Sequence, residues 1–248
     1  MNRRAIAIAA VLACAAVAPA VAGEPRAVIE LFTSQGCSSC PPADKLMGKL
    51  AQDSSLVTMS LPVDYWDYLG WKDTLALHGH SNRERAYADA RGDRDVFTPQ
   101  VVVNGMVHVL GSDKAAIEGA IAQTRRAAAP LTLPVTMAVA GGIVSVNVPA
   151  GDSSANAEVW LCPITGKAQV KIERGENRGH TLTYYNVVRR WVKLGEWHGQ
   201  AEKFTLPLDK LPDADFTLAD VDHLAVIVQS GAASKPGLML GAATASLH

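Results

Sequence analysis

The expected fold is decided by one stretch, Ala27-Val-Ile-Glu-Leu-Phe-Thr-Ser-Gln-Gly-Cys-Ser-Ser-Cys-Pro-Pro-Ala-Asp44. Its first six residues are mostly apolar, which is typical of a short strand buried on both faces. A polar loop follows, and Cys37 and Cys40 then stand two residues apart. An amphipathic pattern from 43 to 52 predicts a helix, and the two prolines before it fit only its first turn. The sequence therefore places both cysteines where a strand ends and a helix begins.

This position favours the ionised form of the first cysteine. Unpaired N–H groups and the positive end of the helix dipole stabilise a thiolate there. They can lower the pKa of a cysteine from about 8.5 to between roughly 3.5 and 7.5. A Cys37 thiolate would attack a partner disulfide, and Cys40 would resolve the mixed disulfide. This interpretation requires a Cys37 sulfur that solvent can reach. The motif alone also allows half of a metal site or a short structural disulfide.

Strand and helix patterns continue to alternate downstream. Residues 56–63 are typical of a second buried strand, and a capping-box pattern at Ser81 predicts a helix. Thr98-Pro99 precedes two β-rich runs joined by Asn104-Gly105, which is a strong hairpin signal. A last helix ends near Arg126. The predicted order of elements is β-α-β-α-β-β-α.

This order resembles the thioredoxin-like superfamily, with Cys37-x-x-Cys40 and Thr98-Pro99 at its two diagnostic places. The resemblance implies an α/β thioredoxin-like N-terminal domain whose Thr98–Pro99 peptide bond is cis and faces the cysteines. It also implies that Pro99 shapes a substrate groove and that the Thr98 backbone pairs with an incoming peptide. The segments IELFTSQGCSSCPPAD, PVDYWDYLGWKD, FTPQVVVNG and LTYYNVVRRWVKLG more closely resemble a bacterial family of secreted proteins with a thioredoxin-like domain of unknown function.

Glu30 is an acidic residue inside the apolar first strand, seven residues before Cys37. Many thioredoxins have a buried acid in the corresponding strand, so the resemblance implies that Glu30 exchanges protons with Cys40. Desolvation would raise the pKa of such a carboxyl group. The alternative is that Glu30 points into solvent at a strand edge, and the sequence does not choose between the two.

Two further groups invite a functional interpretation. The aromatic stretch 64–71 follows the second predicted strand, and its rings either line a peptide groove or, as we favour, pack at the core edge. His78 and His80, together with the two cysteines, would suit copper or zinc. Isolated surface histidines are commoner, so we predict neither a metal nor a cofactor.

The composition changes after Arg126. Residues 127–130 form a short linker, and the β-rich runs beyond it predict a mainly antiparallel, sandwich-like C-terminal domain. The expected domains are therefore a thioredoxin-like one over 23–128 and a β-sandwich-like one over 131–248. Cys162 lies on a predicted strand of the second domain. It is either an inert strand cysteine, which we favour, or a third redox centre that exchanges with Cys37.

The N-terminus has the pattern of a secretory signal peptide over residues 1–22. Two arginines precede an apolar run from 5 to 17 that is too short to span a bilayer, and small residues predict cleavage after Ala22. Lipidation at Cys14 is a weaker alternative. We therefore expect a periplasmic or secreted protein with no stable membrane insertion after cleavage, in a compartment where disulfides persist.

Composition narrows the choice of partners. The 248 residues include 23 basic and 24 acidic side chains, and this near balance argues against sequence-independent binding to nucleic acid. The leading prediction is an exported thiol–disulfide oxidoreductase with protein or small-molecule thiols as clients. The rival is a non-enzymatic secreted module, in which the two cysteines form a structural disulfide or carry copper or another metal. The direction of electron flow, the clients and the oligomeric state are not readable from the sequence.

Overall fold

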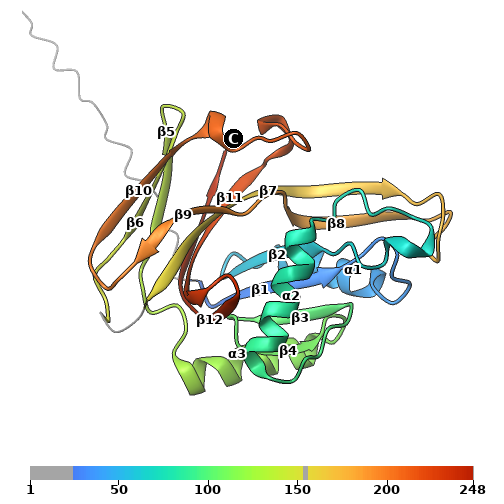
Figure 1. The fold of residues 1–248 in the computed structure, drawn as a ribbon, viewed down its shortest axis with the longest axis horizontal. Coiled ribbons are helices and arrows are strands. Elements are labelled where there is room, and N and C mark those ends of the chain that lie inside the picture. The colour runs from blue at the N-terminus through green and yellow to red at the C-terminus, as the bar shows by residue number, and fades with distance from the viewer. Residues whose placement is uncertain (1–24, 153–155, 248) are drawn as a thin grey trace, which may run out of the picture.

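The computed structural model describes residues 25–152 and 156–247, and Figure 1 shows their arrangement. The expected signal peptide, its cleavage site after Ala22 and Cys14 all lie outside the described residues. Within the described ranges, no helix combines the length and apolar character needed to cross a membrane.

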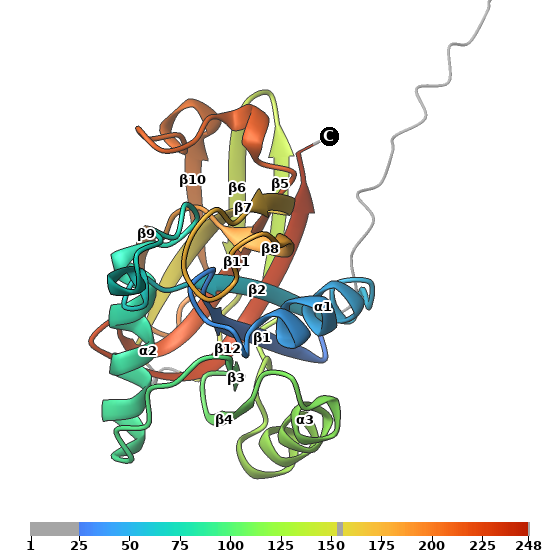
Figure 2. The same cartoon turned by 90° about the vertical axis from the view of Figure 1, so that its right-hand side faces the viewer.

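The first half contains seven main elements in the predicted order: β1 (Ala27–Thr33), α1 (Pro41–Leu50), β2 (Leu56–Pro62), α2 (His78–Arg91), β3 (Gln100–Val103), β4 (Val107–Leu110) and α3 (Lys114–Ala128), with a short 3-10 turn η1 (Asp67–Leu69) before α2. Every residue of β1 and β2 is buried, as expected for strands covered on both faces. Apolar side chains of α1 and α3 cover one face of these strands, and α2 covers the other (Figure 2).

Two local predictions can be compared directly with this half. The Asn104-Gly105 hairpin is confirmed, because both residues have positive φ and join β3 to β4. The capping box at Ser81 is wrong, since α2 begins three residues earlier at His78. The Ser81 hydroxyl donates to Asp64 instead of capping a helix.

The second half is built from strands: β5 (Thr136–Ala140), β6 (Ile143–Val148), β7 (Ala157–Lys171), β8 (Thr181–Val188), β9 (Val192–Trp197), β10 (Glu202–Pro207), β11 (His223–Ala232) and β12 (Lys235–Ser246), with 3-10 turns η2 (Leu208–Lys210) and η3 (Leu218–Asp220). A small sheet has the order β10-β6-β5. Its inner side chains form a second core with Trp197 and the strands β7 and β11.

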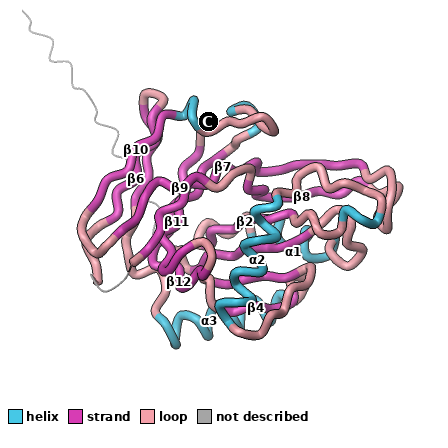
Figure 3. Tube along the Cα trace, in the orientation of Figure 1, coloured by secondary structure: helices cyan, strands magenta, loops and turns pink. Residues whose placement is uncertain are grey.

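The large sheet joins both halves of the chain, and this overturns the expected fold class. Nine strands form one mixed sheet in the order β12-β11-β7-β8-β2-β1-β3-β4, with β9 also paired to β7. Over the residues that the structure describes, the protein is therefore mostly β with three α-helices (Figure 3), and not a thioredoxin-like α/β domain followed by a β-sandwich-like domain. The prediction was wrong because sequence patterns identify strands but not their lateral neighbours. Here β8 pairs parallel with β2, through Ser60 and Val187.

A second contact also joins the two halves, at the turn of the β3–β4 hairpin. The Met239 N–H of β12 donates to the Asn104 carbonyl oxygen over 3.1 Å, and the Asn104 side chain accepts from the Val28 N–H of β1 over 2.8 Å. An added Cβ at Gly105 would lie 2.2 Å from the Gly237 carbonyl oxygen. The hairpin turn is thus tightly packed against β12.

Candidate functional site

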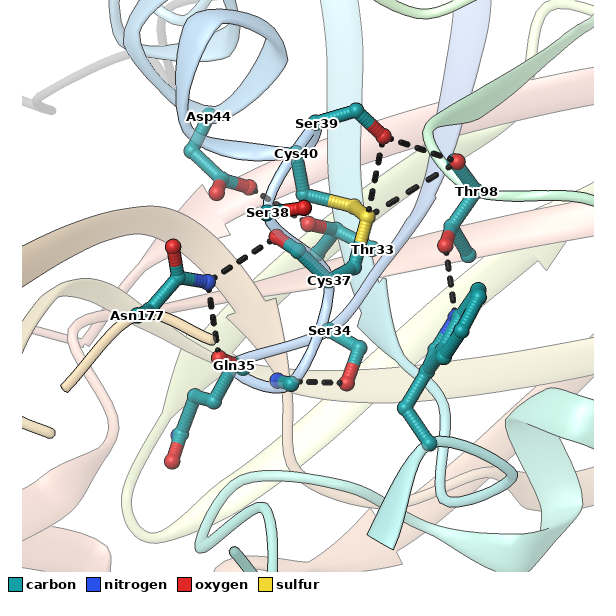
Figure 4. The surroundings of a disulfide bond; sticks show 12 residues. Thr33, Ser34, Gln35, Cys37, Ser38, Ser39, Cys40, Asp44, Thr98 and Asn177 are labelled. Carbon is teal, nitrogen blue, oxygen red and sulfur yellow. Dashed lines mark hydrogen bonds between the residues drawn. A yellow bond between two sulfur atoms is a disulfide. The ribbon is translucent and has the colours of Figure 1, made fainter. Parts of the chain in front are cut away.

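Cys37 and Cys40 form a disulfide at the start of α1, with their Cα atoms 5.5 Å apart (Figure 4). The Cys40 N–H donates to the Cys37 carbonyl oxygen over 3.3 Å, and Cys40 is the N-cap residue of the helix. Both prolines fall in the first helical turn, where a missing N–H costs little. The cysteines therefore lie at a strand-to-helix junction, at the positive end of the α1 dipole, where the first N–H groups, those of Ala43 and Asp44, already donate to the Cys40 carbonyl oxygen.

The Thr98–Pro99 peptide bond is cis, as predicted, and it lies beside the disulfide. The Thr98 carbonyl oxygen is 3.7 Å from Cys37 Sγ and 3.4 Å from Ser39 Oγ (Figure 4). The Ser39 hydroxyl is itself 3.3 Å from Cys37 Sγ. The structure thus brings together four of the five residues singled out in the sequence, and it adds Ser39 to them.

Both cysteines are buried in this disulfide form. Cys37 is 2% exposed and Cys40 is 0% exposed, although Ser38 and Ser39 between them are exposed. The required access from solvent to the Cys37 sulfur is therefore not met in this conformation. The Ser39 hydroxyl and the Thr98 carbonyl oxygen are polar contacts of that sulfur. An incoming thiol reaches a cysteine that is 2% exposed only after its surroundings move.

Glu30 does not lie with the cysteines. Alternation along β1 points Glu30 toward α2, whereas Thr33 points toward α1. Its carboxylate accepts from Arg83 Nε over 2.6 Å and from the Tyr87 hydroxyl, and Arg83 also donates to Gln229 of β11 over 2.8 Å. The side chain is fully buried, so the solvent-exposed alternative is wrong. Glu30 belongs to an internal network that joins β1, α2 and β11.

A buried acid near the disulfide is Asp44 (Figure 4), which was not predicted from the sequence. It lies in the first turn of α1 and is 3% exposed. Its Oδ1 accepts from Thr33 Oγ1 over 2.8 Å, and Oδ2 has no hydrogen-bond partner among the described residues. Burial, with a contribution from the negative charge of Asp73, raises the pKa of Asp44 to about 8. At neutral pH this carboxyl group is mostly neutral, so it adds little charge that would oppose a thiolate.

Side chains from two distant segments hold the loop before Cys37. The Asn177 amide, between β7 and β8, donates to the carbonyl oxygens of Gln35 and Cys37, both over 2.9 Å (Figure 4). Asp73 accepts from the Gln35 N–H over 2.7 Å, and Trp71 Nε1 donates to Gln35 Oε1 over 2.8 Å. The second half of the chain therefore contributes directly to the geometry of the motif.

The aromatic stretch 64–71 reaches the site in two ways. Trp66 Nε1 donates to Thr98 Oγ1 over 2.8 Å, which fixes the residue before the cis-proline. The Trp66 ring stacks on Tyr68, which is 76% exposed. Trp66 and Trp71 are thus packed and hydrogen-bonded, as the favoured interpretation expected, while Tyr68 presents an open ring close to them.

The remaining candidates lie apart from the disulfide. Cys162 is unpaired and fully buried in the core, and burial raises the pKa of its thiol strongly. His78 bonds to Asp64 over 2.8 Å, and the buried His80 bonds to the Pro62 carbonyl oxygen over 2.9 Å. Neither histidine contacts a cysteine, and no cluster of three potential metal ligands occurs within residues 25–152 and 156–247. The metal alternative gains no support here.

Comparison with known families decides the classification of the chain. Residues 28–229 match the model of a family described as a protein of unknown function, DUF1223. The chain belongs to this family. Assignment to the thioredoxin-like superfamily is wrong, because the matching family carries no such assignment and because a mixed nine-stranded sheet with three α-helices is not typical of thioredoxins. The motif and the cis-proline are local features, and they do not determine which strands become neighbours.

Two solved structures resemble the DUF1223 chain along most of its length. The crystal structure of a protein from Agrobacterium tumefaciens, solved by structural genomics, is 32% identical with a TM-score of 0.79, over 91% of this chain and 96% of that one. HBP35 of Porphyromonas gingivalis has a TM-score of 0.60 at 12% identity, over 90% of this chain and 76% of that one, which shows a shared fold only. A comparison with curated proteins found no match.

Proposed function

We propose that this DUF1223 protein is an exported thiol–disulfide oxidoreductase that acts on protein or small-molecule thiols through Cys37 and Cys40. The observation that carries the proposal is a disulfide between cysteines three residues apart at the N-terminus of a ten-residue helix. Reduction of this bond would place the Cys37 thiolate near the positive end of the α1 dipole and beside the Ser39 hydroxyl. These are the surroundings that stabilise a reactive thiolate.

A purely structural role for this bond would contribute little stability. The disulfide joins residues only three apart, so the loop-entropy model gives it about 2 kcal/mol, at the low end for disulfides. Backbone bonds from Cys40 to Cys37 and from Ala43 to Cys40 already hold the same turn. Because this disulfide restrains the chain little, a role in thiol–disulfide exchange is favoured over a structural role.

The exchange is balanced in thiols and electrons. A client thiolate attacks Cys37 Sγ, the bond to Cys40 breaks, and Cys40 leaves as a thiolate. A second client thiolate then attacks the client sulfur of the mixed disulfide and releases Cys37. The client gains a disulfide and gives up two electrons to the cysteine pair, while the protons of the two client thiols pass to the solvent or to the released thiolates. The reverse sequence reduces a client disulfide.

The rival is a structural disulfide in a non-enzymatic module, and the burial of both cysteines favours it. The two proposals differ in whether the surroundings of the disulfide open at a useful rate to admit a thiol. A buried disulfide that stays covered would resist thiols that attack it, whereas a transiently opened one would react.

Trapping a mixed disulfide distinguishes the oxidoreductase from the module with a structural disulfide. In reduced Cys40→Ser, Cys37 has no resolving thiol, so incubation with oxidised glutathione or with a disulfide-bearing model protein is expected to leave a stable adduct. The matched control is Cys37→Ser, which keeps Cys40 alone of the two motif cysteines, while the unpaired, buried Cys162 is present in both variants. We expect at least about tenfold more adduct with Cys40→Ser, measured by intact mass before and after a reductant. If both variants are folded and each forms an equally negligible amount of adduct, the result would contradict the proposal.

A further inference from the structure

We infer that the protein has a second binding site, separate from the disulfide, for a flat, uncharged aromatic or apolar small molecule. A cavity of about 400 Å³ lies between α2 and the strands of the second half. Its lining includes Gly79, Arg83 and Ala86 of α2, Trp160 of β7, Trp191 before β9, and Ser234 between β11 and β12. This volume falls in the usual range of small-molecule sites.

Two indole rings form part of the cavity wall. Trp160 and Trp191 meet edge to face, with ring centroids 6.1 Å apart and ring planes at 78°. Both rings pack against the main core, yet each remains partly exposed. Aromatic groups prefer edge-to-face and offset-stacked packing, so a flat aromatic molecule in the cavity can extend this pair of rings. Covering the exposed ring area would stabilise a complex by about 25 cal/mol per Å².

The charged side chain in the cavity lining, that of Arg83, is already paired. The Arg83 guanidinium carbon lies 4.2 Å from the centroid of the Trp191 ring, and its side chain is 8% exposed. Its charge is balanced by Glu30, 2.6 Å away and fully buried. An anion would gain little from an arginine that is already paired in this way, so the site favours an uncharged ligand.

The cavity and the disulfide occupy opposite faces of the first strands. The cavity adjoins α2, whereas the cysteines start α1 on the other face (Figure 2). Among the described residues, no hydrogen bond or ion pair joins a residue that lines the cavity to the loop 34–40. Ligand binding is therefore expected to be the same in the oxidised and the reduced protein, so this inference and the proposed redox function fail or succeed separately.

The test uses N-phenyl-1-naphthylamine, an uncharged aromatic probe that becomes fluorescent when it leaves water. The wild-type chain is expected to bind it saturably at one site. In Gly79→Phe the new side chain starts from a helical position that lines the cavity and has no heavy atom within 4 Å of the added Cβ. We expect this variant to bind at least about tenfold more weakly, a loss of about 1.4 kcal/mol.

Gly119→Phe is the matched control, because Gly119 is an exposed glycine of α3 that also has no atom within 4 Å of an added Cβ. It is expected to bind like the wild type. Ala86→Leu, which fills the cavity from the helix side, is the second test and should weaken binding as Gly79→Phe does. Equal affinity in the wild type and both folded filling variants, or no saturable binding at all, would overturn the inference. Preference for the anionic probe anilinonaphthalene sulfonate would overturn the uncharged ligand class.

Discussion

Replacing Arg83 by methionine is expected to lower the free energy of unfolding by about 3–5 kcal/mol. Arg83 donates to Glu30, Tyr87 and Gln229, and all four side chains are buried. Methionine fills a similar volume but leaves the Glu30 carboxylate in the core with the Tyr87 hydroxyl as its remaining partner. A buried charge without its counterion costs far more than the pair itself contributes. Urea unfolding, followed by far-UV circular dichroism, measures the loss.

Two comparisons make this expectation specific. Arg85→Met removes an exposed arginine from the same helix and should change stability by less than about 0.5 kcal/mol. The double variant Glu30→Leu/Arg83→Met leaves no uncompensated charge and should recover most of the loss. If Arg83→Met cost no more than Arg85→Met, the buried network would not be the link between β1, α2 and β11 that the structure shows.

Gly105→Ala is expected to destabilise the protein by about 3 kcal/mol or more. Gly105 has a φ of 74°, a conformation that costs an L-residue about 1–2 kcal/mol. The added Cβ would also lie 2.2 Å from the Gly237 carbonyl oxygen, so the hairpin and β12 must separate. Such overpacking adds typically about 1–3 kcal/mol. The variant therefore tests whether the first half of the chain is packed against the last strand.

The control is Gly92→Ala at the C-terminal end of α2. Its φ of 79° is close to that of Gly105, but nothing lies within 4 Å of an added Cβ. Gly92→Ala should lower the free energy of unfolding only by the conformational cost of about 1–2 kcal/mol. Equal losses for the two variants in urea unfolding would mean that the hairpin turn does not contact β12 in solution.

The elements of the first half could be predicted from sequence because their signals are local. Apolar runs predicted β1 and β2, and Asn104-Gly105 predicted the hairpin. The order of the seven elements was predicted from these and the helix patterns between them. The predicted fold class was wrong because the pairing of strands that are far apart in the sequence has no local signal. The contact between β2 and β8 joins Ser60 to Val187, and an alternating pattern does not reveal such a neighbour.

Some residues of the candidate site could likewise be predicted from local sequence motifs, and others could not. Cys37, Cys40 and the cis Thr98–Pro99 bond form one cluster, as predicted from the motifs. Glu30 was misassigned because its neighbours were not weighed, although alternation along β1 separates it from Thr33. Asp44 had a usable signal, since it falls on the apolar stripe of α1 with Ala43 and Met47.

No local sequence pattern pointed to Asn177 as a residue of the site. It lies 140 positions after Cys37, and only the folded chain brings its amide to the cysteine loop.

The central claim is that the Cys37–Cys40 disulfide exchanges with thiols, and its reduction potential tests this most directly. The protein is equilibrated in glutathione redox buffers, denatured in acid and alkylated, and the thiols are counted by mass, with the unpaired Cys162 as a constant background. We expect two further thiols to appear at a midpoint between roughly −270 and −120 mV. A midpoint below about −300 mV would identify a structural bond and contradict the account.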